Sequence, residues 1–146
     1  MKVRRTAALL ATATSLLAAG IGTGGVASAA AATATLSIPY TGCQGSNGTW
    51  YDYTLRVQGT TGYHPNGIRV EVRLWGSDPS YDDALAGPYS NSYDWSGGYS
   101  IDFCANRSTL DEDWGQDEIY AGVRVYDRRT NQLKEKVESN MIRDHF

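Results

Sequence analysis

Apolar and polar residues alternate along several separate segments of the chain. In residues 68–74, IRVEVRL, every second residue is apolar and each residue between is charged. A period of two is typical of a β-strand with one buried and one exposed face. The same pattern predicts further strands at residues 33–40, 51–57, 99–103, 119–125 and, more weakly, 133–140.

Segments rich in glycine and polar residues separate these predicted strands. They are residues 42–48, 59–67, 96–98 and 127–132, the last of which closes a hairpin. The stretch 76–98 is interpreted as a loop, long for a connection. No helical periodicity competes with the strand pattern. The sequence therefore predicts an all-β fold, a single antiparallel β-sandwich of about six to eight strands.

The first 29 residues have the composition of a secretory signal peptide. A short basic head is followed by an apolar, alanine-rich run, and Ala27-Ser28-Ala29 supplies the small residues of a cleavage site. A membrane anchor is the weaker alternative, because no basic stop-transfer flank follows the run. We therefore expect residues 1–29 to be removed and residues 30–146 to form one secreted, extracellular domain without stable membrane insertion.

Cleavage would change the charge of the chain. The full sequence has 13 basic and 16 acidic residues and a net charge of −3. Lys2, Arg4 and Arg5 would leave with the signal peptide, so the mature chain would have 10 basic residues and a net charge of −6. So acidic a domain is not expected to bind nucleic acid or anionic membranes. We expect it to be a monomer.

Cys43 and Cys104 are the two cysteines of the chain. An even count in an exported protein predicts a disulfide bond. Cys104 has the opposite parity from Phe103 in its predicted strand. The bond is therefore expected at a strand end, where it would join the rim rather than fill the core.

An acidic stretch precedes the predicted strand 119–125. Asp111, Asp113 and Asp117 could point into one loop and ligate calcium, which is the one candidate cofactor. A second acidic loop could contribute Asp78, Asp82 and Asp83. The EF-hand template does not fit this spacing. The alternative is a rim of solvated like charges.

Aromatic residues gather at predicted strand ends and within residues 76–98. Amphipathic rings on loops are typical of surfaces that recognise proteins or sugars. Aromatic side chains can equally cover the open ends of a small sandwich. The candidate binding surface consists of Trp75, Tyr81, Tyr89, Tyr93, Trp95 and Trp114.

Three segments carry a resemblance to known proteins: GTWYDYTLRV, LWGSDPSYDD and NRSTLDEDWGQDEIYAGVRVYD. They resemble small secreted actinobacterial proteins of unassigned function. More loosely, alternating strands joined by Asp-bearing loops are similar to transthyretin-like and C2-like β-sandwich domains, and C2 domains hold calcium between such loops. The resemblance implies a sandwich fold and brings no catalytic residue.

Sequence motifs for catalysis are absent. The chain has no G-x-S-x-G, no H-E-x-x-H and no phosphate-binding glycine loop, and neither His64 nor His145 has an evident nucleophile partner. We therefore predict no enzyme and no catalytic residue. The favoured function is an extracellular recognition module for a protein or polysaccharide. The alternatives are a secreted inhibitor of a hydrolase, inserting residues 76–98 into its partner, and a small carboxylate-dependent hydrolase.

Overall fold

The computed structural model describes residues 31–95, 97–111 and 115–146, which form ten strands and one short helix. All strand pairs are antiparallel. The smaller main sheet has the order β1-β4-β7, from Thr33–Ser37, Tyr53–Thr60 and Gly98–Ala105. The larger has the order β10-β8-β5-β6, with β9 also paired to β8; its strands are Ile68–Ser77 (β5), Asp82–Tyr93 (β6), Asp117–Asp127 (β8), Leu133–Glu138 (β9) and Ile142–Asp144 (β10).

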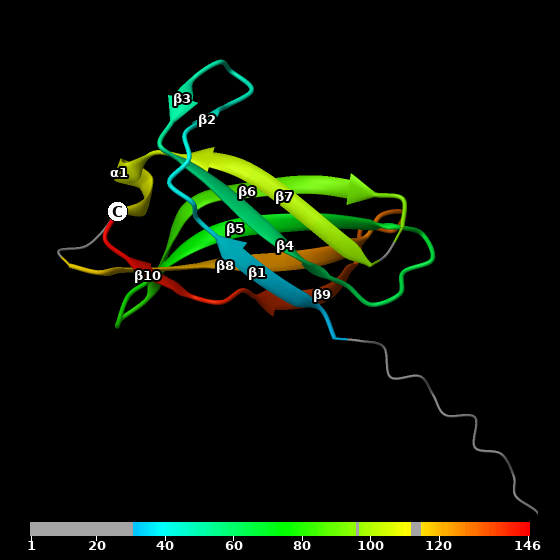
Figure 1. Ribbon diagram of the computed structural model, residues 1–146. Coiled ribbons are helices and arrows are strands. Elements are labelled where there is room, and N and C mark those ends of the chain that lie inside the picture. Colours follow the sequence, from blue (N-terminus) through cyan, green and yellow to red (C-terminus); the bar gives the residue numbers. More distant parts are fainter. Residues whose placement is uncertain (1–30, 96, 112–114) are drawn as a thin grey trace, which may run out of the picture.

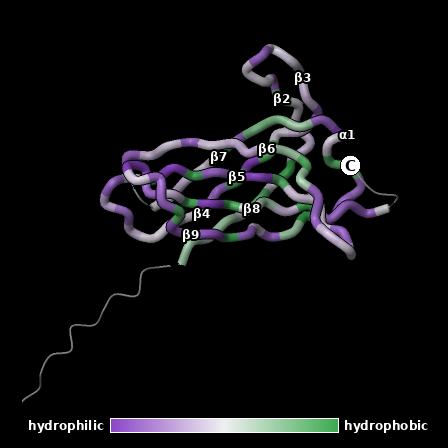
Figure 2. The backbone as a smooth tube through the Cα atoms, turned by 180° about the vertical axis from the view of Figure 1, so that it is seen from behind, coloured by the Kyte–Doolittle hydropathy of each residue, from purple (hydrophilic) through white to green (hydrophobic). Residues whose placement is uncertain are grey.

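The two main sheets pack face to face, and their strands cross one another (Figure 1). Each strand contributes its alternate apolar residues to one core: Leu55 and Val57 from β4 meet Val70, Val72 and their neighbours on the opposite sheet. Hydrophobic and hydrophilic residues alternate along the strands of the two sheets, and hydrophilic residues predominate in the turns that join them (Figure 2). The predicted all-β antiparallel sandwich is confirmed.

The number of strands exceeds the predicted six to eight because several elements are very short. β2 (Cys43–Gln44) and β3 (Trp50–Tyr51) have two residues each, and β10 has three. Residues this few show no period that sequence alone can detect. The helix α1 (Arg107–Leu110) is one turn long and places Leu110 in the core.

The interpretation of residues 76–98 as a loop is wrong. Most of this stretch is β6, a 12-residue strand that pairs with β5 in a long hairpin. Its sequence, DDALAGPYSNSY, lacks alternation because β6 is an edge strand and most of its residues are exposed. Gly87 has a positive φ of 100° and the register shifts nearby, which interrupts the regular pattern further. The segment is therefore no free loop that could enter a partner's cleft.

Asp127 fixes the hairpin that connects β8 to β9. Its Oδ1 accepts hydrogen bonds from the backbone N–H groups of Arg129 and Thr130 and from the Thr130 hydroxyl, and its Oδ2 accepts one from Asn66 Nδ2. These bonds, led by that of Asn66, hold the pKa of the buried Asp127 carboxyl well below its usual range. The predicted turn at 127–132 is confirmed, and the carboxylate also ties it to residue 66.

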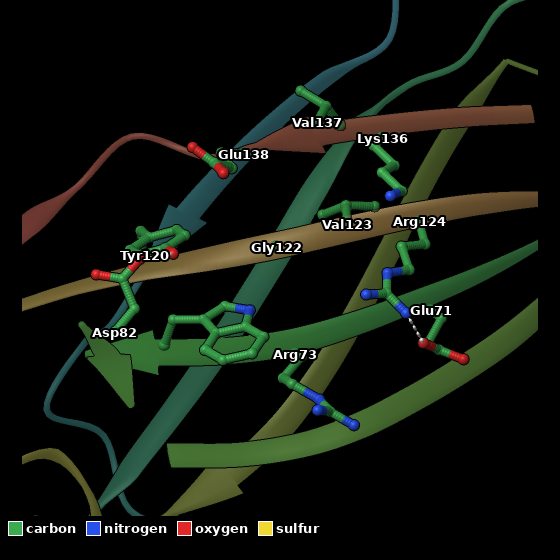
Figure 3. A pocket seen from close by; sticks show the side chains of 11 residues that line it. Glu71, Arg73, Asp82, Tyr120, Gly122, Val123, Arg124, Lys136, Val137 and Glu138 are labelled. Atoms are coloured by element: carbon green, nitrogen blue, oxygen red, sulfur yellow. Dashed lines mark hydrogen bonds and ion pairs between the residues drawn. The ribbon is translucent and has the colours of Figure 1, made fainter. Parts of the chain in front are cut away.

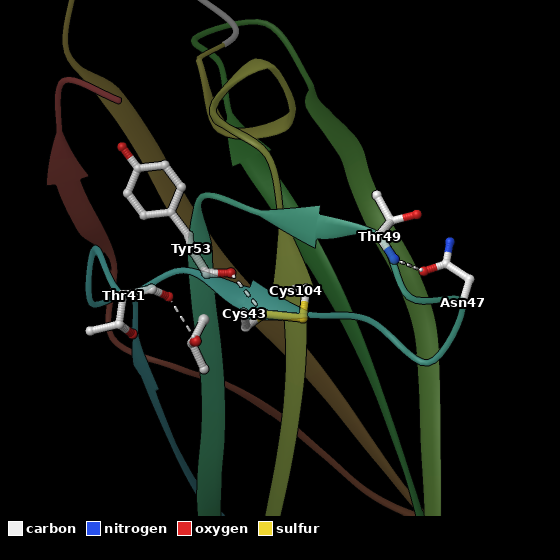
Figure 4. The surroundings of a disulfide bond; sticks show 7 residues. Thr41, Cys43, Asn47, Thr49, Tyr53 and Cys104 are labelled. Atoms are coloured by element: carbon white, nitrogen blue, oxygen red, sulfur yellow. Dashed lines mark hydrogen bonds between the residues drawn. A yellow bond between two sulfur atoms is a disulfide. The ribbon is translucent and has the colours of Figure 1, made fainter.

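The predicted disulfide is present between Cys43 and Cys104, with Cα atoms 6.0 Å apart (Figure 4). Cys104 lies one residue before the end of β7, so the bond is at the rim, as expected. It fastens the β2–β3 hairpin, which projects from one end of the sandwich (Figure 1). Within the hairpin, Gly45 N–H donates to Thr49 O at 2.8 Å and Thr49 N–H donates to Asn47 Oδ1 at 3.0 Å.

The predicted signal peptide, residues 1–29, lies outside the described residues. In the part of the chain that the structure describes, no helix is long and apolar enough to cross a membrane.

Candidate functional site

A groove of about 360 Å³ lies on the outer face of the larger sheet (Figure 3). This face is formed by the residues of β5, β8 and β9 that alternate with the core residues, so their polar character follows from the period of the strands. The groove is lined by Glu71, Arg73, Trp75, Asp82, Tyr120, Gly122, Val123, Arg124, Lys136, Val137 and Glu138.

Gly122 forms the floor of the groove beneath Trp75. The register pairs Trp75 of β5 with Tyr120 of β8, and the Trp75 indole leans from there across Gly122. A Cβ at position 122 would lie 2.9 Å from the indole Nε1 and 3.3 Å from Cδ1, closer than side chains normally approach. The absent side chain therefore gives the indole room to lie low over the sheet.

Tyr120 and Asp82 close one end of the groove. The Tyr120 hydroxyl donates a hydrogen bond of 2.7 Å to Asp82 Oδ2. Burial, this hydrogen bond and the negative charges of Asp82 and Glu138 raise the pKa of Tyr120 to about 12. The ring therefore stays neutral at physiological pH and is held in place by its bond to the edge strand β6.

Arginine and lysine residues occupy the other end. The Arg73 guanidinium lies 5.6 Å from the centroid of Trp75, a cation–π arrangement. Arg124 of β8 pairs in register with Lys136 of β9, and its Nη1 is 3.9 Å from Glu71 Oε1. Glu71 is also 3.4 Å from Arg69, whose guanidinium stacks 4.1 Å over Tyr126 just beyond the groove.

The aromatic residues named from the sequence do not form one surface. Trp75 lines the groove, but Tyr89 and Tyr93 point from β6 toward the core, where Tyr89 stacks on Phe103 at 4.3 Å. Tyr81 and Trp95 are exposed near the two ends of β6, and Trp114 lies outside the described residues. Of the proposed set, Trp75 lines the groove together with several charged side chains, and Tyr89 lines a second pocket, beside the β2–β3 hairpin, with Asp102.

The candidate calcium residues are also separated. Asp117 is buried at the start of β8, Asp111 is exposed after α1, and Asp113 lies outside the described residues. Asp82 belongs to the groove through Tyr120, while Asp83 is exposed and Asp78 is half-buried. Among the residues that the structure describes, no three His, Cys, Asp or Glu side chains are grouped to hold a metal ion. Calcium binding stays a prediction.

Sequence reasoning missed most of the groove. Alternation predicts Tyr120 and Arg124 on the polar face of strand 119–125, and the predicted hairpin at 127–132 brings the weakly patterned segment 133–140, with Lys136 and Glu138, beside it. Nothing in the sequence shows that residues 68–74 and Trp75 are the neighbours on the other side. Gly122, a glycine inside an otherwise regular strand, was the one sequence signal that could have indicated the close approach of a neighbouring side chain to the sheet.

Comparison with known proteins gives no family for this chain. No protein-family model matches it, and no curated protein matches it.

Proposed function

We propose that this protein is a secreted carbohydrate-binding module whose binding site is the groove around Trp75. The observation that carries the proposal is the position of the Trp75 indole across Gly122, beside Tyr120 and within a rim of charged side chains. Flat aromatic rings offer an apolar surface to the C–H face of a sugar ring, through dispersion and weak C–H contacts.

The polar rim suits a ligand rich in hydroxyl groups. Asp82 and Glu138 can accept hydrogen bonds, and Arg73, Arg124 and Lys136 can donate them. A cavity with an apolar floor and a few convergent polar groups is the usual form of a small-ligand site. The size of about 360 Å³ fits one or two sugar units better than a protein surface.

Extracellular location is part of the proposal. It is supported by the signal-like segment 1–29 and by the Cys43–Cys104 disulfide, since disulfides persist in oxidising compartments. We propose binding rather than hydrolysis, and a search for released sugars in the same assays would detect a hydrolase.

A panel of soluble and immobilised polysaccharides tests the proposal. The chain should bind at least one, and Trp75→Ala should weaken binding by at least about tenfold, as truncation of a central aromatic contact does. Trp50→Ala is the matched control, because Trp50 is 70% exposed and lies on the projecting hairpin. Binding that is absent throughout, or that is lost with Trp50 and kept without Trp75, would contradict the proposal.

A second candidate function rests on that hairpin. The β2–β3 hairpin projects from the sandwich, is fastened by the disulfide and presents Trp50 to solvent (Figure 1). A braced loop with an exposed aromatic residue could insert into a partner protein, as an inhibitor of a hydrolase does. Inhibition of one enzyme in a hydrolase panel, lost in Trp50→Ala and kept in Trp75→Ala, would favour this function.

A further inference from the structure

The charges of the groove are separated along the strands. Asp82, Tyr120 and Glu138 lie toward one end, and Arg73, Arg124 and Lys136 lie toward the other, where Glu71 is the one lining carboxylate (Figure 3). The register explains this, because on the outer face Gly122 is opposite Glu138, while Arg124, two residues further along β8, is opposite Lys136. The Trp75 indole lies over Gly122, between the two ends.

The cations at the basic end are not neutralised equally. Arg69, beyond the groove, is held by Asn131 at 2.8 Å, by Glu71 at 3.4 Å and by stacking on Tyr126. In contrast, Arg73 and Lys136 form no ion pair with any carboxylate of the described residues. Arg124 Nη1 lies 3.9 Å from Glu71 Oε1, a long ion pair, and the same carboxylate also pairs with Arg69. The basic end therefore has donors and positive charge to offer a ligand.

We infer that the groove is selective for an acidic saccharide, a sugar unit that bears a carboxylate. This inference deepens the proposed function and rests on it. The sugar ring packs on Trp75, its carboxylate faces Arg73, Arg124 and Lys136, and its hydroxyl groups face Asp82 and Glu138. Guanidinium groups bind carboxylates through paired, charge-assisted hydrogen bonds, and the Arg73 guanidinium lies 5.6 Å from the Trp75 centroid, beside the surface proposed for the sugar ring.

The acidic net charge of the domain does not oppose this selectivity at short range. The sequence from residue 30 has a net charge of −6, yet four of its basic residues, Arg69, Arg73, Arg124 and Lys136, lie on this one face. At physiological ionic strength, charges farther than about 8 Å are largely screened. A carboxylate in the groove is therefore affected mainly by the charges that line it, and at the basic end these are Arg73, Arg124 and Lys136 beside the single carboxylate of Glu71.

The test uses matched ligands that differ at the carboxyl group alone, which is charged in the acid and neutral in the ester. Short oligomers of galacturonate, glucuronate and mannuronate are each titrated as the free acid and as the methyl ester, together with a neutral glucan and a neutral mannan. The free acid of at least one oligomer should bind about tenfold more tightly than its ester. Raising NaCl from about 0.05 M to about 0.5 M should reduce this ratio, because salt weakens only the charged interaction.

Substitutions in the groove test whether its cations cause the preference for the acid. Arg73→Gln and Lys136→Gln should each reduce the ratio of acid to ester affinity toward one, since a lost neutral hydrogen bond weakens acid and ester alike and only the lost charge changes their ratio. Arg129→Gln is the control, since Arg129 is an exposed cation in the β8–β9 turn. Circular dichroism and the melting temperature should be the same in all of these variants, because the substituted side chains are on the surface.

The outcomes separate the two claims. If a saccharide binds in a Trp75-dependent manner but acid and ester bind equally, or neutral glycans bind better, the inference is overturned and the proposed function stands. If the ratio survives both groove substitutions, the selectivity does not come from these cations, and the inference is likewise overturned. If no saccharide binds, the proposed function is overturned, and the inference with it.

Discussion

The indole of Trp75 lies directly across Gly122 of the neighbouring strand, where a Cβ would be 2.9 Å from the indole Nε1. The groove thus depends on a residue that has no side chain. Gly122→Ala should push the indole off the sheet, since the ring is the part free to move. We expect saccharide affinity to fall by roughly tenfold with little loss of stability, because glycine itself is unfavourable inside a strand.

Saccharide titrations of the Gly122→Ala and Gly98→Ala variants and of the wild type, compared by their affinities, check this expectation. Gly98 begins β7 on the other sheet, and the nearest atom to a Cβ there is 3.9 Å away. Gly98→Ala should bind as the wild type does. Equal affinities for all three proteins would show that the indole position does not matter for binding.

The disulfide should stabilise the fold without affecting the groove. It closes a loop with a sequence separation of 61 residues, for which the chain-entropy model gives about 4 kcal/mol. Replacement of Cys43 and Cys104 by serine should lower the Tm by roughly 10 to 25 °C. Saccharide affinity measured below the new Tm should be unchanged, because the bond joins β2 to β7, away from the groove on the larger sheet.

Asp127 should make the stability of the domain depend on acid pH. Its pKa is lower in the folded chain than its ordinary value, chiefly through the hydrogen bond from Asn66. A depressed carboxyl pKa stabilises the fold above the unfolded value of about 4, and this contribution is lost as the pH falls toward the folded pKa. Asp127→Asn removes the charge and can place an amide N–H donor where Asp127 Oδ2 accepts the hydrogen bond of Asn66 Nδ2.

The Tm difference between wild type and Asp127→Asn should therefore be largest above about pH 5 and should narrow below about pH 4. Thermal unfolding across this range measures it, with the exposed Asp83→Asn as control. A difference that is constant with pH would show that Asp127 acts through shape alone and not through its charge.

A close backbone approach at Gly59 should make this position intolerant of any side chain. A Cβ there would lie 1.9 Å from the carbonyl oxygen of Thr33 and 2.6 Å from the Tyr99 hydroxyl. The Tyr99 hydroxyl donates to that same Thr33 oxygen at 2.8 Å. Gly59→Ala should therefore separate β1 from β4 and lower the Tm by roughly 10 °C or more. A Tm like that of Gly98→Ala would contradict the observed pairing of β1.

Among the strands that sequence alone predicted, the clearest alternation belongs to those with one fully buried face. β5 and β8 alternate without interruption because each packs against the opposite sheet along its whole length. β6 was missed because an edge strand has little to bury, and its Gly87-Pro88 step interrupts the period. The alternation of apolar residues therefore reports burial and not strand formation as such.

The groove could be predicted only in part. Trp75 was a candidate from its residue type, and Arg73 and Arg124 were placed on a polar face by alternation. Their meeting with Lys136 and Glu138 depends on the order and register of β5, β8 and β9, which are set by tertiary packing. Local sequence holds no record of that register.

Saccharide binding at Trp75 can be observed directly in a ¹H–¹⁵N NMR spectrum, where each of the four tryptophan residues gives one indole N–H signal. The chemical shift of each signal reports whether a ligand binds beside that residue. Trp75→Phe assigns the relevant signal. On titration with the tightest-binding oligosaccharide, we expect the Trp75 indole signal and the Gly122 amide to shift together in a saturable manner, while the Trp50 indole signal stays in place. A saturable shift of the Trp50 or Trp95 indole, with Trp75 unmoved, would contradict the account.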